Sequence, residues 1–382
     1  MEEKNKVIFC TNCGAKNSTE SKFCTKCGKA LAEVSDEEID NDSEYVETKG
    51  SMFDSATSKL NSWTGGSGAV EVSWKDFFSE VFKSHTEDEA EDIFIAGTKD
   101  TTPSLDEVSN EEVHPWLFSR ILAVIIIAGI LLTVLTQLNQ RTGDLIAADV
   151  IISIAVPMSA LVLFFEINVF KNISFYKIGK IMLLGGILSL IVTIILDSFT
   201  SISALNLIGS LLTGSIEEIS KVLIAAFFIQ KLNIKRIFNG LLVGAAVGTG
   251  FSAFENIQYI VASTGQIASF TDAFQRTLLS ISDHTEWCAI ATAALIIAKG
   301  SQKLTTNTFM DLRFLKFLVL VILIHTCWDW NFFDNYTYIR YAILVVITWV
   351  TVFVMVHAGL REVKELQLSF DVDLSTNKGG EV

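Results

Sequence analysis

The sequence predicts an all-α polytopic membrane protein, with about eight transmembrane helices after a soluble N-terminal region. Half of the 382 residues are hydrophobic, and the mean hydropathy of +0.43 is high for a soluble chain of this length. The apolar residues are unevenly placed, because residues 116–360 form a succession of apolar runs of about 20 residues, the length that crosses a bilayer. Residues 1–115 have a polar composition, so we expect membrane insertion only after them.

Two cysteine motifs stand at the start of the chain. Both read C-x-x-C-G, and ten residues separate them. Each motif offers two thiolates on a tight turn, and four such sulfurs make a closed tetrahedral zinc site. The segment resembles the short zinc ribbons at bacterial protein N-termini. The alternative is two disulfides, which the cytosol would keep reduced. The predicted ligands of this structural zinc are Cys10, Cys13, Cys24 and Cys27.

The region before the membrane divides by composition. Residues 31–50 hold eight Asp or Glu against one Lys, which is typical of a solvated linker. Residues 73–95 carry aromatic side chains at helical spacing, which predicts one or two helices. The predicted organisation is a small cytoplasmic zinc ribbon at 1–30, a flexible, partly helical acidic linker at 31–72, a juxtamembrane helical subdomain at 73–115, a membrane domain at 116–360 and a cytoplasmic tail at 361–382.

The overall charge and the loop charges indicate partners and orientation. A net charge of −14 argues against nucleic-acid binding, which needs a basic surface. The predicted spans are about 116–137, 149–168, 179–197, 205–229, 237–261, 277–298, 313–333 and 338–358. On one side of the membrane their ends and loops carry Lys171, Lys177, Lys180, Lys231, Lys235, Arg236, Lys299, Lys303, Arg313, Lys316, Arg361 and Lys364. The other side carries only Arg141, Arg276 and Arg340. The positive-inside rule makes the first side cytoplasmic, and an even number of spans then places both termini there. We expect no signal peptide before the cysteine motifs.

Four of the apolar spans contain acid or base groups. They hold Glu217, Glu218 and Lys221 in the fourth span, Glu255 in the fifth, His284 in the sixth, and His325 with Asp329 in the seventh. A charge inside a bilayer costs about 2.5–3.5 kcal/mol on insertion scales, so an ionisable residue there points to function. Lys221 follows the two glutamates by four and three residues, so it shares a helix face with both and can offset one carboxylate.

These groups are expected to meet inside the membrane. At a rise of 1.5 Å per residue, Glu255, His284 and His325 lie roughly 10–12 Å from the outer ends of their spans, and Glu217 lies roughly 18 Å from its own. Imidazole and carboxylate groups suit Zn²⁺, and a free carboxylate nearby can act as a base. The pattern predicts one catalytic metal site nearer the outer leaflet, with Glu255, His284, His325 and Asp329 as candidate ligands.

Each group also has an ordinary structural explanation. The glutamate pair with Lys221 could be an ion-pair cluster, and Glu255 could make a hydrogen bond between packed helices. His284 could lie at the membrane interface, and His325 with Asp329 could be a pair that binds no metal. One shared site explains why acid or base groups occur in all four successive spans, so we prefer this interpretation.

Four short motifs therefore follow one another, one in each successive span. They are Glu217-Glu218-x-x-Lys221, Phe251-x-x-x-Glu255-Asn256, His284 at the start of its span, and His325-x-x-x-Asp329. In this order they resemble the motifs of the PrsW intramembrane metalloproteases, which are related to CAAX prenyl endopeptidases and bacteriocin-processing proteins. The resemblance covers roughly residues 116–360. A single motif is common, whereas the ordered set is specific.

The resemblance implies a multi-spanning helical fold and metal-dependent hydrolysis of a peptide bond in a membrane-bound protein. It implies that Glu217 is the general base, that Glu218 is its partner, and that His284 and His325 are metal ligands or oxyanion contacts. The founding bacterial member is associated with trimming an anti-sigma factor on the extracytoplasmic side. This suggests a bacterial plasma-membrane protein in regulated signalling, whose zinc ribbon recruits a cytoplasmic partner.

Two other functions remain open from the sequence. A transporter also places acidic residues near the midplane, but it needs a polar route to both faces, and the cytoplasmic halves of these spans hold few polar groups. A non-catalytic membrane sensor would use the zinc ribbon to bind a partner and retain an inactive protease fold. That function predicts that the motif residues can be replaced without loss.

Overall fold

The computed structural model describes residues 7–9, 16–18, 51–139, 143–200, 202, 204–263, 270–332 and 337–378. The chain divides into two compact units, 1–56 and 57–382. In the first unit, strands β1 (Val7–Phe9) and β2 (Lys16–Ser18) pair in antiparallel fashion, with Ile8 opposite Asn17. The predicted zinc ligands Cys10, Cys13, Cys24 and Cys27 lie outside the described residues.

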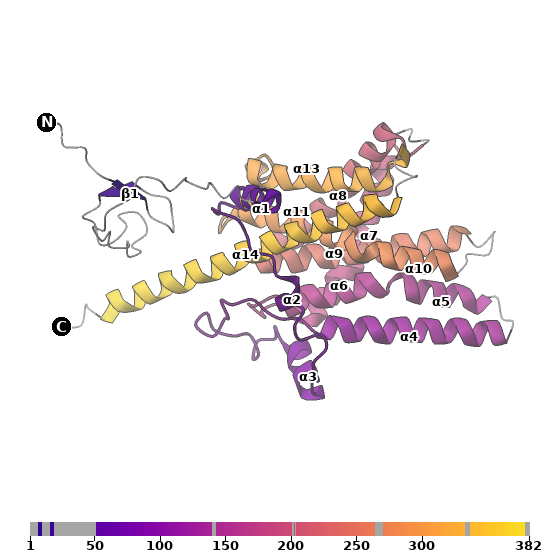
Figure 1. Ribbon diagram of the computed structural model, residues 1–382, viewed down its shortest axis with the longest axis horizontal. Coiled ribbons are helices and arrows are strands. Elements are labelled where there is room, and N and C mark those ends of the chain that lie inside the picture. The colour runs from indigo at the N-terminus through magenta and orange to yellow at the C-terminus, as the bar shows by residue number, and fades with distance from the viewer. Residues whose placement is uncertain are drawn as a thin grey trace, which may run out of the picture. The chain divides into compact units, whose positions relative to one another are not determined.

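The rest of the described chain is helical (Figure 1). Its helices are α1 (Met52–Trp63), α2 (Trp74–Phe77), α3 (Glu87–Ile95), α4 (Leu117–Leu138), α5 (Gly143–Ser153), α6 (Ala155–Glu166), α7 (Phe175–Asp197), α8 (Leu207–Lys231), α9 (Ile237–Ser263), α10 (Phe270–Leu279), the short 3₁₀ turn η1 (Ser280–Ser282), α11 (His284–Lys299), α12 (Thr306–Phe309), α13 (Leu312–Asp329) and α14 (Thr337–Lys378). The predicted all-α membrane class is confirmed.

Among the described residues, five stretches of helix are long and apolar enough to cross a bilayer. They are Leu117–Leu138, Leu145–Glu166, Phe175–Asp197, Ile237–Ala262 and Thr337–Phe370. The other three predicted spans coincide with α8, α11 and α13. Charged side chains interrupt the apolar pattern of α8 and α13, and the 16 residues of α11 reach only about 24 Å. The count of eight therefore stays a prediction.

Helix α9 is the central element of the bundle, in contact with α6, α7, α8, α11 and α14 (Figure 1). A row of glycines at every fourth position, Gly240, Gly244 and Gly248, faces α11. A Cβ atom on Gly248 would overlap the carbonyl oxygen of His284. Because these positions lack a Cβ, the two backbones touch. This contact fixes Glu255, two turns beyond Gly248, beside the first residue of α11.

Gly248→Ala is expected to destabilise the fold by about 1–3 kcal/mol, because an added methyl group would press on the backbone of α11. The measurement is thermal unfolding of the full chain in detergent. Gly179→Ala is the matched control, since a Cβ at Gly179 in α7 would have no neighbour within 4 Å. That change is expected to be neutral or to stabilise by about 0.5–1 kcal/mol. Equal losses in the two variants would contradict the tight packing of α9 on α11.

The boundary between α5 and α6 has a local cause. Pro157 has no N–H, so the carbonyl oxygen of Ser153, four residues earlier, lacks its helical donor. The side chain of Asn256 on α9 donates to that oxygen at 3.0 Å. Thr277 on α10 donates to the neighbouring carbonyl of Ile152 at 2.6 Å. These two hydrogen bonds connect α9 and α10 to the end of α5, next to the polar cluster described below.

Part of the predicted linker packs against α14. The Arg361 guanidinium donates to the side-chain oxygen of Asn61 at 3.2 Å and to the carbonyl of Thr64 at 2.8 Å. One and a half turns further along α14, the Gln367 amide donates to the carbonyl of Val108 at 2.8 Å. The end of α14 is therefore held by segments that precede the first membrane helix. The predicted domain boundaries themselves stay predictions.

Candidate functional site

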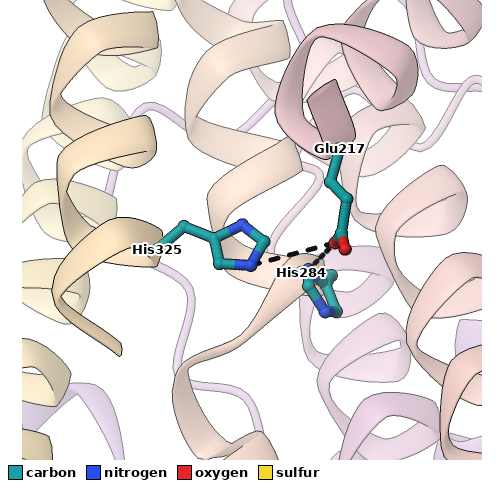
Figure 2. Close-up of side chains that lie close together, drawn as sticks. All are labelled: Glu217, His284 and His325. Atoms are coloured by element: carbon teal, nitrogen blue, oxygen red, sulfur yellow. Dashed lines mark ion pairs between the residues drawn. The ribbon is translucent and has the colours of Figure 1, made fainter. Parts of the chain in front are cut away.

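Three helices bring Glu217, His284 and His325 together (Figure 2). Glu217 comes from the middle of α8, His284 is the first residue of α11, and His325 lies one turn before the end of α13. One ligand atom from each lies within 4.8 Å of the others. All three side chains are buried, with exposed fractions of 9%, 6% and 3% for the whole residues. Among the described residues, this is the group whose donor atoms could hold a metal ion.

Local sequence places each of the two histidines. Asp283 caps α11 by accepting from the backbone N–H of Thr285 at 3.0 Å, and Glu286 accepts from the Asp283 N–H at 3.1 Å. This capping box starts the helix at His284 and so fixes where its imidazole points. On α8, Gly214 faces the side chain of His325, at a distance that leaves room for no more than one added methyl group. The helix α13 can therefore approach α8 closely one turn before Glu217.

The carboxylate of Glu217 points between the two imidazoles (Figure 2). Its Oε2 lies 3.8 Å from Nε2 of His325 and 3.9 Å from Nδ1 of His284. These distances are too long for hydrogen bonds, and this buried oxygen has no hydrogen-bond partner. Ligands around a tetrahedral Zn²⁺ with bonds of about 2.0–2.1 Å stand about 3.4 Å apart. The donor set therefore fits one metal ion after a small contraction.

Other carboxylates orient the two imidazoles. Glu255 lies 2.9 Å from Nε2 of His284, and Glu218 lies 2.9 Å from Nδ1 of His325. Each pairing lets an imidazole N–H donate to a carboxylate and turns the second nitrogen toward Glu217. Asp329 differs, because its Oδ2 lies 3.2 Å from Nε2 of His325, the nitrogen that faces Glu217.

Lys221 supplies the positive charge within the cluster. Its ammonium is fully buried, 2.8 Å from Glu218 Oε1 and 3.7 Å from Glu217 Oε2. It also lies 2.5 Å from Nδ1 of His284 and 4.3 Å from the centre of the Phe251 ring. The ammonium thus contacts the same lone pair of His284 that a metal would use. A metal at this nitrogen requires the lysine side chain to withdraw from it.

The cluster opens on a cavity of about 690 Å³. Its lining includes Glu217, Glu255, His284, His325 and Asp329, whereas Glu218 and Lys221 lie behind the wall. Of the two adjacent glutamates, only Glu217 can therefore meet a molecule in the cavity. The rest of the wall mixes polar and apolar side chains, and it includes the aromatic residues Trp287, Trp328 and Tyr341 and the basic residues Arg276 and Arg340.

All seven residues predicted for the membrane site thus lie in one cluster, although their pairings differ from those expected. Glu217, predicted as a base, belongs to the group that could hold a metal, and Glu255, predicted as a ligand, contacts the far nitrogen of His284. The sequence reasoning missed Trp287, whose ring centre lies 4.9 Å from that of His325 and 5.4 Å from that of His284. Its position three residues after His284, on the same helix face, was the available signal.

Comparison with known protein families gives two matches. Residues 177–357 match the model of the PrsW family intramembrane metalloprotease, and residues 9–31 match that of a zinc-ribbon domain. No match to a curated protein or to a solved structure was found. The first match contains every residue of the cluster, and both matches imply Zn²⁺. Residues 177–357 are therefore similar to the PrsW family intramembrane metalloproteases, which supports a multi-pass membrane peptide hydrolase, and residues 9–31 are similar to a zinc ribbon.

Proposed function

We propose that this protein hydrolyses a peptide bond of a membrane-bound protein near the outer leaflet, using a metal ion and Glu217 as the general base. The observation that carries the proposal is the convergence of Glu217, His284 and His325 around an unpartnered carboxylate oxygen at the wall of a large cavity. A buried carboxylate oxygen without a hydrogen bond is costly unless a ligand or a reaction uses it.

His284 and His325 are the residues that would hold the metal, through Nδ1 and Nε2 respectively, with Asp329 beside the second nitrogen. The bound ion would supply Lewis acidity, which polarises the scissile carbonyl and makes a water molecule more acidic. Glu255 and Glu218 hold the two rings in the orientation and tautomer that this requires.

Glu217 is placed to move the proton. Its Oε2 faces both imidazole nitrogens and has no hydrogen bond of its own, so it is free to accept a proton from the attacking water. The same carboxylate can then pass the proton to the leaving amine. Lys221 lies 3.7 Å away and supplies a positive charge beside this carboxylate.

The cavity indicates how a substrate could enter. Its volume of about 690 Å³ accommodates a short unwound peptide segment but not a packed helix with its side chains. Aromatic side chains on the wall, among them Trp287, Trp328 and Tyr341, offer contacts to such a segment. We propose that a transmembrane substrate unwinds locally before its bond reaches Glu217.

The cellular setting is part of the same proposal. The distribution of basic residues supports cytoplasmic termini and a cytoplasmic zinc ribbon, and the resemblance to PrsW proteases supports a bacterial plasma membrane. The resemblance to PrsW proteases supports a role in regulated signalling, such as the processing of an anti-sigma factor. The zinc ribbon would then bind a cytoplasmic protein that directs or regulates cleavage.

Metal content tests the proposal directly. We expect about two zinc ions per chain in the gently purified full-length protein, one for the ribbon and one for the membrane site. His325→Ala is expected to lose one ion, and Cys10→Ser with Cys13→Ser the other, as measured by elemental analysis. Cleavage of transmembrane substrates in proteoliposomes should disappear only in the His325 variant and after removal of metal by a chelator. A full-length protein whose metal content does not change in the His325 variant would refute the membrane metal site.

A further inference from the structure

A second cavity lies at the end of the bundle that carries most of the basic residues. It encloses about 350 Å³ and is lined by the segment before α7, the start of that helix, and the loop between α8 and α9. Three of its side chains are cationic, namely Lys177, Lys235 and Arg236. No carboxylate stands among the described residues of its lining. The cavity is therefore electropositive.

Two asparagines of this cavity have unused hydrogen-bonding capacity. The side-chain oxygens of Asn172 and Asn239 are buried and have no hydrogen-bond partner. Asn239 is 3% exposed, so water has little access to it. Buried polar groups normally have partners, and a buried amide without one at a cavity wall indicates a ligand that reaches it. A third asparagine, Asn233, lines the same cavity.

We propose that this cavity binds a phosphate group, and specifically the head group of an anionic phospholipid. The three cations provide the charge that a phosphate requires. The asparagine amides can bond to hydroxyl groups next to it, such as those of a glycerol head group. Glu362 lies 3.7 Å from Arg236 and accepts from the N–H of Ile237 at 2.8 Å, so it offsets part of the charge of Arg236 from outside the cavity.

The adjoining helix surface favours a lipid as the source of the phosphate. Lys177 lies in the first turn of α7, and the positions seven, eleven and fourteen residues later continue the same face. These are Leu184, Leu188 and Ile191, whose side chains are 43%, 38% and 46% exposed. An anion bound at Lys177 would thus sit at the head of an apolar strip along which acyl chains can pack. A membrane helix presents such a strip to lipid.

Native mass spectrometry of the full chain with defined lipids tests this proposal. We expect phosphatidylglycerol to be retained in preference to phosphatidylcholine. Each cation that contributes should be worth about fivefold in affinity, so Lys177→Ala is expected to lose about fivefold and the double variant with Arg236→Ala about 25-fold. Lys180→Ala is the matched control, since this lysine stands on the same helix outside the cavity and should change affinity less than twofold.

A variant at another residue tests whether the lysine changes act through the cavity itself. Asn239→Asp keeps the shape of the side chain and adds a negative charge inside the cavity, so it should also weaken retention of phosphatidylglycerol. Inorganic phosphate is added as a competitor in both series. Competition would support retention of the lipid through its phosphate, and retention that excess inorganic phosphate does not reduce would contradict a phosphate site. Equal losses in the Lys177 and Lys180 variants, or no preference for phosphatidylglycerol, would overturn the proposal.

Discussion

Glu217→Gln is expected to reduce peptide-bond cleavage by about 10²–10⁴-fold, the usual contribution of a positioned general base. The amide has nearly the same shape as the carboxylate but cannot accept a proton from water. Because Glu217 is the glutamate of the pair that lines the cavity, its neighbour Glu218 cannot replace it. The measurement is the initial rate of cleavage of a transmembrane substrate in proteoliposomes, after the variant has been shown to fold.

The metal content of the same variant separates two roles of Glu217. If Glu217 acts only as a base, the variant keeps its second zinc ion while its rate falls. If the carboxylate is itself a ligand, as the donor distances of 3.8 Å and 3.9 Å permit, the variant loses zinc together with activity. Glu286→Gln is the matched control, because Glu286 is also buried nearby but serves to cap α11. Cleavage at the wild-type rate by folded Glu217→Gln protein would rule out the proposed base.

Lys221→Met is expected to destabilise the folded protein by about 3–5 kcal/mol, the usual cost of removing one partner from a buried ion pair. Both Lys221 and Glu218 are fully buried, and 2.8 Å separates their charged atoms. Methionine fills similar space without the charge. The loss of stability would therefore come from the unpaired carboxylate of Glu218 and not from a cavity. Thermal unfolding in detergent, without added metal, measures it.

A double variant shows whether the loss is electrostatic. Lys221→Met combined with Glu218→Gln removes both charges, and it should recover most of the stability that the single change loses. Lys231→Met serves as the control, since Lys231 lies at the exposed end of the same helix. If the double variant were no more stable than the single one, packing around the lysine stem would explain the loss, and the ion pair would not.

The sequence was informative wherever one physical pattern dominated. Apolar runs of bilayer length gave the positions of α4, α7, α9 and α14, because the helix is the structure that satisfies its own backbone groups in lipid. The same argument indicated that charged residues in successive spans should meet. Their cluster in the structure follows from that expectation, although each helix had to be placed at the right height and rotation.

Features that depend on a single residue or on a side-chain angle were harder to predict. The predicted span 277–298 is broken before His284, because the Asp283 and Glu286 capping box begins a new helix there. The capping-box pattern is visible in the sequence, but it is a weaker signal than the apolar run around it. The choice between Glu218 and Glu255 as partners of the imidazoles depends on which ring nitrogen faces which carboxylate. No spacing rule determines that choice.

Helix α14 extends far beyond the predicted span 338–358, as it continues to Lys378 over 42 residues. Its full length is about 63 Å, roughly twice the thickness of the hydrocarbon core. The run from Arg361 onward is rich in Glu, Lys, Leu and Gln, which keep a helix going in water. The hydropathy pattern predicted where α14 leaves the apolar part of the bilayer, but it did not predict where the helix ends.

This helix is held by different contacts at its two ends. Tyr341 near its start lines the cavity of the candidate site, and Arg361 is hydrogen-bonded to the segment around Asn61, about 30 Å along the axis. A rotation of only about 2° about the Arg361 end displaces the Tyr341 end by about 1 Å. A misplacement of that size at a reacting centre can change a rate by about 10²-fold. One continuous helix therefore joins the segment around Asn61 to the wall of the candidate-site cavity.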